Sequence, residues 1–461
     1  MKLKSLELSN YRCFESLSID FEDQLTVLVA ENGVGKTAIL DAIAVALGPF
    51  IGGFDTGIRK DFKHEDARLA IRDVSHIEKL QLEDIILRME SQYPISLVAF
   101  GFIEGLDERW SRELTGKKTQ TSFGKARGLI NYAKNLQQQV RKGEQVTLPI
   151  ITYYGTGRLW KQTKDGARRS VDSDSRLYGY HDALNSESNY RAFEKWFTDM
   201  SIAESNTNSE ITRKNPPKAE YFINPTSNFK PPVEFMELSH VRRAIDQCLS
   251  VAGWDTLHYE FKRRELVIYN SNDNSFMPVA RLSDGVKAML SLTADIAYRC
   301  VQLNPHLASP IEETTGIVLI DEVDLHLHPK WQQKVLDDLR KTFPKIQFIV
   351  TTHSPVVLTT VKPECIRILS ENGEVLTPAI NTLGEESKDT LEDIMGTHSR
   401  PPIKEADLLS DYLNHINQGD IDSPDVIRWR QELEQVFGSD YSQLKLADMV
   451  INKWRAKRGI A

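Results

Sequence analysis

A segment near the N-terminus combines two glycines, a lysine and a threonine in a spacing that can bind phosphate. It runs Ala30-Glu31-Asn32-Gly33-Val34-Gly35-Lys36-Thr37 and departs from the pattern GxxxxGK(S/T) only at Ala30, which replaces a glycine. Glycines let successive backbone N–H groups converge on phosphate oxygens, and a helix that follows adds the partial positive charge of its N-terminus. The alternative is a glycine-rich turn that only begins a helix.

This segment predicts ATP and Mg²⁺ as ligands. Lys36 would bring a positive charge to the β- and γ-phosphates, and Thr37 would offer a hydroxyl to Mg²⁺. The residues expected to contact the nucleotide are Asn32, Gly33, Val34, Gly35, Lys36, Thr37 and Ala38.

Two carboxylates follow a short apolar run much later in the chain. Residues 316–320 (Gly-Ile-Val-Leu-Ile) predict a buried strand that delivers Asp321 and Glu322 at its carboxyl end, where α/β sheets bind ligands. Asp321 would hold Mg²⁺ through water, and Glu322 would polarise the attacking water. Two solvated acids after a strand are the alternative, and the phosphate-binding pattern upstream favours the functional interpretation.

Two weaker features lie near these carboxylates in the sequence. Ser283 and Gly285, in Leu-Ser-Asp-Gly, precede a predicted helix, where serine can cap the helix and glycine can let the backbone approach an anion. His353 directly follows a predicted buried strand. Taken singly, the first is an ordinary helix start and the second an ordinary core or surface histidine.

The elements that must position these residues alternate between strand and helix. Short apolar, β-rich runs predict buried strands, and apolar residues at helical spacing predict helices between them. The expected strands are 2–9, 25–30, 94–104, 148–154, 316–320 and 346–351, and the expected helices are 38–47, 183–205, 235–252, 284–302 and 329–342. Residues 107–147 are polar and helix-prone, and the chain is helical again from about 385. Short buried strands between helices predict a parallel α/β core.

The composition excludes several classes of protein. The chain has 461 residues, a formal net charge of −8 and four separated cysteines without a CxxC pair, which argues against a disulfide scaffold, a zinc ribbon or bulk-charge coating of nucleic acid. No apolar run is long enough to cross a bilayer, and the N-terminus alternates like a strand rather than a secretory signal. We therefore expect a cytoplasmic protein.

Along the chain the order is phosphate loop, Leu-Ser-Asp-Gly segment, Asp-Glu pair and histidine, and this order resembles the ABC-type ATPase head over roughly residues 1–75 and 255–370. The resemblance implies an α/β P-loop NTPase fold, here with a helical insertion and a helical C-terminal tail. It implies that Ser283 and Gly285 of one subunit contact the γ-phosphate bound by another, so that heads pair. Carried over, the catalytic residues are Glu322, Lys36 and His353, the metal-binding residues are Thr37 and Asp321, and Asp324 begins the D-loop.

Further segments of the sequence resemble one subgroup of this family. Asn10-Tyr11-Arg12 and the string from Asp321 to Pro329 look like the SMC-related, overcoming-lysogenization-defect group, in which Arg12 would contact nucleotide and Arg59 would belong to an arginine loop linked to nucleotide or DNA sensing. Residues 153–160 (Tyr-Tyr-Gly-Thr-Gly-Arg-Leu-Trp) occupy the place of the Q-loop, but no clear glutamine is present. A Q-loop role there stays open.

The overall pattern is most similar to the ATPase subunit of Septu anti-phage systems, the PtuA family. That resemblance implies an HNH endonuclease partner and a head-to-head dimer, or a trimer of dimers. A nuclease site in this chain is not expected, since Asp420-Ile421-Asp422 lacks a preceding strand-borne glutamate. An SMC-like DNA repair or recombination clamp, and the ATPase effector of a retron, are the alternatives. An oligomer with an inactive ATP site is disfavoured because every catalytic position is filled.

Two basic stretches, 158–169 and 117–127, are candidate contacts for DNA or an RNA–DNA hybrid, or else solvated loops. No membrane partner is expected. The expected division of the chain follows from the motifs. The head is formed by 1–105 and 255–384, the insertion with a helical lobe and basic loops by 106–254, and the partner-binding or oligomerisation tail by 385–461.

Overall fold

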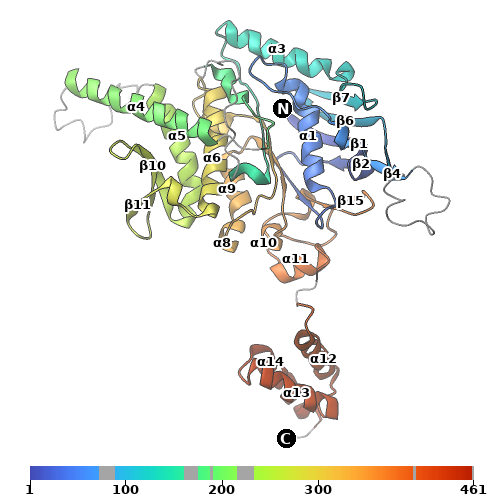
Figure 1. Cartoon of the computed structure of the whole chain (residues 1–461). Coiled ribbons are helices and arrows are strands. Elements are labelled where there is room, and N and C mark those ends of the chain that lie inside the picture. Colours follow the sequence, from blue (N-terminus) through green and yellow to red (C-terminus); the bar gives the residue numbers. More distant parts are fainter. Residues whose placement is uncertain (72–88, 160–174, 187–189, 215–232, 398–400, 459–461) are drawn as a thin grey trace. The chain divides into compact units, whose positions relative to one another are not determined.

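The computed structural model describes residues 1–71, 89–159, 175–186, 190–214, 233–397 and 401–458. The chain divides into two compact units, Met1–Thr390 and Leu391–Ala461 (Figure 1). Each is described by itself. Most of the basic stretch 158–169 lies outside the described residues.

A six-stranded sheet forms the centre of the first unit. Its order is β15-β14-β3-β13-β12-β8, and the five strands from β14 to β8 run parallel. The bounds are Leu25–Val29 for β3, Ile150–Tyr154 for β8, Gly316–Ile320 for β12, Ile346–Thr351 for β13, Ile366–Leu369 for β14 and Val375–Leu376 for β15. Every residue of β3, β8, β12 and β13 is buried, as in a parallel sheet covered on both faces. This confirms the α/β core.

A second, antiparallel sheet lies on the other side of helix α1, Lys36–Ile51 (Figure 1). Its order is β2-β1-β6-β7, with bounds Phe14–Asp20, Lys2–Tyr11, Ile95–Ile103 and Leu106–Leu114. Helix α1 contacts β6 and β7 of this sheet and β13 of the first. Trp110 on β7 donates from Nε1 to the carbonyl of Ala46 at 2.9 Å. Contact on both sides explains why nearly every residue of α1 is buried.

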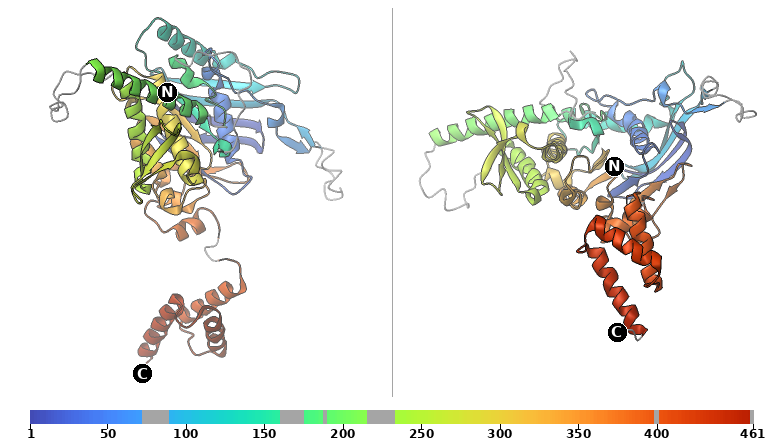
Figure 2. Two further views of the ribbon diagram at one scale, coloured as in Figure 1. Left: turned by 60° about the vertical axis from the view of Figure 1, so that its left-hand side comes forward. Right: turned by 60° about the horizontal axis from the view of Figure 1, so that its bottom comes forward.

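A lobe of helices and a three-stranded sheet lies beside the core, on the side away from α1 (Figures 1 and 2). Its helices are α4 (Tyr190–Lys214), α5 (Val233–Leu249) and α6 (Asp284–Leu303). Its antiparallel sheet has the order β11-β10-β9, with bounds Ser275–Pro278, Glu265–Asn270 and Trp254–Glu260. The remaining elements of the unit are β4 (Leu69–Ile71), β5 (Met89–Ser91), α3 (Arg127–Arg141), α7 (Pro310–Glu313), α8 (Pro329–Gln332), α9 (Val335–Thr342) and α10 (Pro355–Leu358), and α11 (Ser387–Asp393) spans the boundary between the units.

The second unit contains three helices, α12 (Lys404–Gln418), α13 (Pro424–Phe437) and α14 (Ser442–Lys457). They share a core of Leu409, Tyr412, Ile416, Ile421, Val426, Leu433, Leu444 and Ala447. Arg430 ties α13 to α14, since its two terminal nitrogens donate to Asp448 at 2.8 and 3.0 Å. The expected helical tail is thus a small unit with its own core.

Three local expectations differ from the structure. Residues 107–147 were expected to be helical, but β7 occupies their first part and α3 only the later part. The single helix expected over 329–342 is two short helices, α8 and α9. Strands β7 and β8 fall in the range expected to be an insertion, yet they pair with strands of the two main sheets. The head therefore uses more of the middle of the chain than the motifs alone indicate. Among the described helices, none is long and apolar enough to cross a membrane.

Candidate nucleotide site

The loop between β3 and α1 has the backbone expected of a phosphate cradle. Gly33 and Gly35 have φ angles of +86° and +113°, a region that favours glycine. A Cβ atom at Gly35 would lie 2.5 Å from Cζ of Phe14 and 2.6 Å from Sγ of Cys13, so this position accepts only glycine without rearrangement. Since α1 begins at Lys36 directly after a glycine, its first N–H groups face the loop without a capping side chain.

Lys36 turns its amine into this loop. Its Nζ donates to the carbonyls of Ala30 at 2.8 Å and Glu31 at 2.9 Å. Burial lowers the pKa of Lys36, while Asp321, Glu322 and Asp324 oppose that shift. The lysine therefore lies within the electrostatic field of the Asp-Glu segment.

The phosphate loop and the Asp-Glu strand meet through hydroxyl groups. Strand β13 lies between β3 and β12, and because the three strands are parallel, their carboxyl ends share one edge. Thr37 donates from Oγ1 to Oδ2 of Asp321 at 2.8 Å, and Thr351, at the end of β13, donates to Oδ1 at 2.7 Å. Asp321 is only 3% exposed, so two hydroxyl donors fix its orientation.

Glu322 adopts a left-handed backbone conformation with φ of +49°, which is uncommon outside glycine. Its N–H donates to Oγ1 of Thr351 at 2.7 Å. The same threonine therefore orients Asp321 through its hydroxyl hydrogen and the backbone of Glu322 through its hydroxyl oxygen.

The oxygen donors of Thr37 and Asp321 fit Mg²⁺, a hard cation that prefers few protein oxygens and retains water and phosphate ligands. Among the described residues, no group of three or more His, Cys, Asp or Glu side chains forms a separate metal cage. Thr37 and Asp321 would hold the ion together with phosphate oxygens.

The Leu-Ser-Asp-Gly segment reaches the residues that follow β12. Ser283 is the N-cap residue of α6, but its side chain makes no capping hydrogen bond in the structure, unlike the expectation for a helix cap. A Cβ atom at Gly285 would lie 2.6 Å from the carbonyl oxygen of His326, so α6 begins in close contact with that backbone. Among the described residues, no hydrogen bond joins Ser283 or Gly285 to the phosphate loop of the same chain.

Arg12 lies close to the phosphate loop but is held by carboxylates. Its neighbour Cys13 donates from Sγ to the carbonyl of Val34 at 3.5 Å. The guanidinium of Arg12 donates to Asp66 at 2.8 Å and to Asp41 at 2.7 Å. Burial alone would raise the pKa of Asp41, but Lys60 and Arg12 hold it below its ordinary value. Arg12 is therefore adjacent to the loop, and its guanidinium is engaged by acids.

The remaining expected residues lie at varied positions. His353 follows β13 by two residues and is half-buried, at the same sheet edge as Asp321. Asp324 accepts a hydrogen bond from Oγ1 of Thr352 at 2.5 Å. Arg59 lies beside Gly52, which ends α1, and its guanidinium covers the ring of Phe123 at 4.5 Å. Arg59 is therefore at the far end of α1 from the phosphate loop. The next residue, Lys60, donates to the carboxylate of Asp41.

Several residues of the site are not predicted by the sequence motifs. Thr351 lies in the Thr-Thr-His segment, and a hydroxyl at the end of a buried strand was the available signal. At the Q-loop position, Tyr154 donates to Oδ2 of Asp295 at 2.7 Å, and Arg299 donates to the same oxygen at 2.7 Å. This buried network joins the end of β8 to α6, the helix that begins at Ser283.

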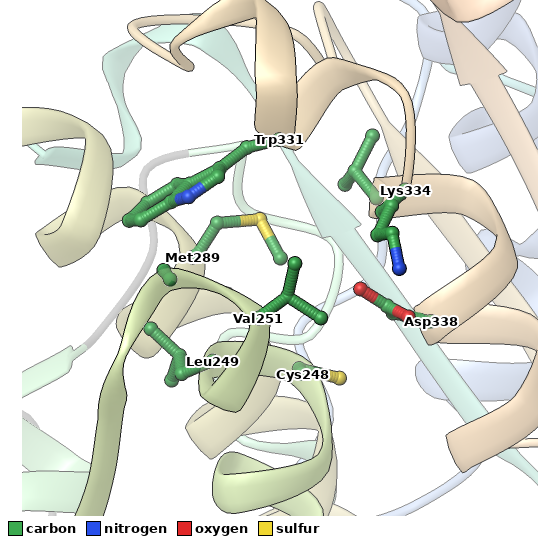
Figure 3. A pocket seen from close by; sticks show the side chains of 9 residues that line it. Cys248, Leu249, Val251, Met289, Trp331, Lys334 and Asp338 are labelled. Carbon is green, nitrogen blue, oxygen red and sulfur yellow. The ribbon is translucent and has the colours of Figure 1, made fainter. Parts of the chain in front are cut away.

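A pocket beside α6 is separate from this site (Figure 3). It is formed by Cys248, Leu249, Val251, Ala252, Met289, Trp331, Lys334, Val335 and Asp338. Lys334 and Asp338 point toward one another at one side of it (Figure 3). Burial, with a contribution from Asp337, raises the pKa of Asp338 to about 6. The pocket contains no residue expected to bind ATP.

Comparison with known proteins agrees with this geometry. The AAA domain family matches residues 5–249, more than half of the chain. A retron Ec83 probable ATPase from Escherichia coli is 29% identical over 98% of this chain and 87% of its own length. The Septu protein PtuA from Bacillus thuringiensis is 24% identical over 87% of this chain and 86% of its own length. A solved Smc head bound to the C-winged helix domain of ScpA covers 82% of this chain at 15% identity, with a TM-score of 0.46. The chain belongs to the AAA domain family and is an ATPase.

Proposed function

We propose that this chain is the ATP-binding and ATP-hydrolysing regulatory subunit of an anti-phage defence complex, and that paired heads gate an associated HNH-type nuclease. One observation carries the enzymatic part. Lys36 and Thr37 of the phosphate loop meet the Asp321-Glu322 segment, and Thr351 of a third segment binds the carboxylate of Asp321 and the N–H of Glu322. The similarity to Septu PtuA supports the defence role.

In the proposed reaction, Lys36 neutralises charge on the transferred phosphoryl group and Glu322 orients the water that attacks in line. Thr37 and Asp321 would hold Mg²⁺, which supplies further charge neutralisation when bound. The loop amides and Gly35 position the phosphates. His353, at the same edge, would contact the γ-phosphate.

The proposed dimer follows from the position of the Leu-Ser-Asp-Gly segment. Ser283 is exposed, and no described hydrogen bond joins it to the phosphate loop of its own chain. A second copy could place its Ser283 and Gly285 against the γ-phosphate held by the first. ATP would then bridge two heads, and hydrolysis would release them. Multi-angle light scattering with and without ATP tests this, since the proposal requires an ATP-dependent increase in mass.

The second unit is the proposed dock for the nuclease. It has a core of its own and lies outside the segments that form the nucleotide site. We expect that deleting residues 400–461 abolishes co-purification of the co-expressed nuclease while ATP hydrolysis persists. Recovery of the nuclease by the truncated chain would refute this assignment.

Membership of a retron system is the second candidate, favoured by the similarity to the retron Ec83 ATPase over nearly the whole chain. The neighbouring reading frames discriminate between the two. A short HNH protein supports a Septu-type complex, and a reverse transcriptase with a noncoding RNA supports a retron. Native mass spectrometry of the chain co-expressed with its neighbours would then identify the assembly.

A further inference from the structure

We propose that the outer face of the β9–β11 sheet binds single-stranded nucleic acid. We call it the aromatic–basic face, defined by the rings of His258, Tyr269 and Phe276 and by the turn residues Lys262, Arg263 and Arg264. It is separate from the two basic stretches indicated by the sequence. This inference goes beyond the ATPase function and does not depend on the nuclease partner.

The strand register places the three rings on one face. Tyr269 on β10 pairs with Phe276 on β11, and the ring centroids are 5.1 Å apart. His258 on β9 contacts Phe276 at 4.8 Å, with the rings at 89°. On β10, Leu266, Val267 and Ile268 are all buried, and Val267 lies on the same face as the three rings. The ring-bearing face is therefore exposed at Phe276 and half-buried at His258 and Tyr269.

Phe276 is available for stacking. It is 55% exposed, although it touches two other rings. Because His258 meets it edge-on and Tyr269 is tilted at 53°, neither ring stacks flat on it. The hydroxyl of Tyr269 donates to Asn274 at 2.9 Å, which fixes that ring. An exposed aromatic ring on a sheet is a stacking platform for an unpaired base, whereas the bases of a duplex already stack on one another.

The turn between β9 and β10 supplies positive charge. Lys262, Arg263 and Arg264 are all exposed. Arg263 lies 3.9 Å from Glu265, whereas the side chains of Lys262 and Arg264 make no ion pair with any residue that the structure describes. Two cations thus remain to contact phosphates, the usual source of salt-dependent affinity.

The rings and the cations form a track along the sheet. Phe276 pairs with Tyr269 toward one end of β10. The basic turn adjoins the other end of β10, where Glu265 pairs with Glu260. A strand lying along β10 could stack a base on Phe276 and reach the turn with its phosphates. From Pro278, the chain passes through the short turn Val279–Arg281 to Ser283. Bound nucleic acid would therefore lie next to the segment proposed to close over ATP.

The test measures fluorescence anisotropy of the full chain with labelled oligonucleotides of about 15 nucleotides, as single-stranded DNA, single-stranded RNA and duplex DNA. We expect binding to single strands that weakens as salt rises from about 50 to 200 mM, and weaker binding to the duplex. Phe276→Ala should lower the affinity by roughly 5- to 100-fold, the usual effect of removing one stacking partner. Lys262→Glu combined with Arg264→Glu should lower both the affinity and the salt dependence.

Matched controls separate this face from other surfaces. Phe102→Ala removes an exposed ring from β6 of the other antiparallel sheet, and Lys117→Glu with Lys118→Glu alters one of the basic stretches. Both should bind like wild type, and all variants should keep the wild-type melting temperature and ATP turnover without nucleic acid. A preference between DNA and RNA identifies the source of the strand.

Three outcomes would overturn the proposal. One is no binding of single strands at low salt, and another is a preference for duplex. The third is wild-type binding by Phe276→Ala and by the Lys262/Arg264 variant. If Phe276→Ala leaves nucleic-acid binding intact but loses a co-purifying protein, the face is a protein-docking surface. Since ATP turnover is measured in the same samples, failure of this proposal is distinguishable from failure of the ATPase assignment.

Discussion

The hydroxyl of Thr37 donates to the carboxylate of Asp321 at 2.8 Å, although the two residues are 284 positions apart. The other carboxylate oxygen accepts from Thr351 at 2.7 Å. The start of α1 and the ends of β12 and β13 are therefore joined through one buried aspartate. The arrangement presets the oxygens that would share Mg²⁺ and places Glu322 directly after them.

Thr351→Val removes the hydroxyl that orients Asp321 and the N–H of Glu322 while preserving the side-chain shape. Hydrogen bonds to charged groups contribute about 1.5 to 3 kcal/mol, so we expect kcat for ATP to fall roughly 10- to 100-fold. Affinity for nucleotide should change less, because the phosphate loop is untouched. Steady-state ATP turnover and nucleotide titration provide the two readouts. Thr351→Ser is the control, and it should retain most activity.

Glu322→Gln should slow hydrolysis by about 100-fold or more, since a positioned acid–base group contributes on that scale. ATP binding should persist, and the ATP-bound dimer should accumulate. Turnover assays and light scattering with ATP check both effects. The exposed Glu374→Gln is a control of the same chemistry away from the site. Wild-type turnover in Glu322→Gln would show that another residue acts on the water.

Lys36→Ala and Ser283→Arg should each abolish turnover, the first by loss of nucleotide binding and the second by blocking the paired head. Mixing the two inactive proteins tests the composite site. One site of each mixed dimer combines an intact Lys36 with an intact Ser283, so random exchange of subunits should restore about a quarter of wild-type activity. No recovery after proven subunit exchange would argue that each head uses its own Ser283.

Asp338→Asn should stabilise the first unit at neutral pH. Burial raises the pKa of Asp338 from 3.8 to about 6, so the folded state binds its proton more tightly than the unfolded state between these values. The free energy of unfolding of the wild type therefore falls as the pH rises through that window, and the whole destabilisation by ionised Asp338 is present above pH 6. Because the carboxyl is partly solvated, we expect a gain of about 1 kcal/mol or less at pH 7.5.

Thermal melts of Asp338→Asn and wild type across pH measure this gain. The difference in melting temperature should be largest above about pH 6 and should vanish below the unfolded pKa of 3.8. Asp199→Asn, an exposed substitution on α4, should show no such trend. A difference that is constant with pH would mean that the carboxyl of Asp338 is not the cause.

The candidate phosphate loop and most of the core can be predicted from the sequence. The spacing of Gly33, Gly35, Lys36 and Thr37 is a local pattern, and the positive φ angles of the two glycines agree with the loop predicted from it. The fully apolar runs at β3, β12 and β13 are equally direct, because a strand buried on both faces must be apolar throughout.

Strand β7 shows why some elements were missed. Only alternate residues in its second half are buried, and its outer positions are charged, so its sequence is similar to that of a polar helix. Pairing with β6 decides the matter, because that strand satisfies its backbone hydrogen bonds and buries Trp110.

The contacts between distant residues of the site depend on the packing of the fold and cannot be read from the sequence. The insertion of β13 between β3 and β12 brings Thr351 to Asp321, and no local pattern encodes strand order. The close approach of Gly285 to His326 likewise depends on how α6 packs. The physical reason is that local sequence sets backbone preference and burial pattern, whereas contacts between separated segments depend on the packing of whole layers.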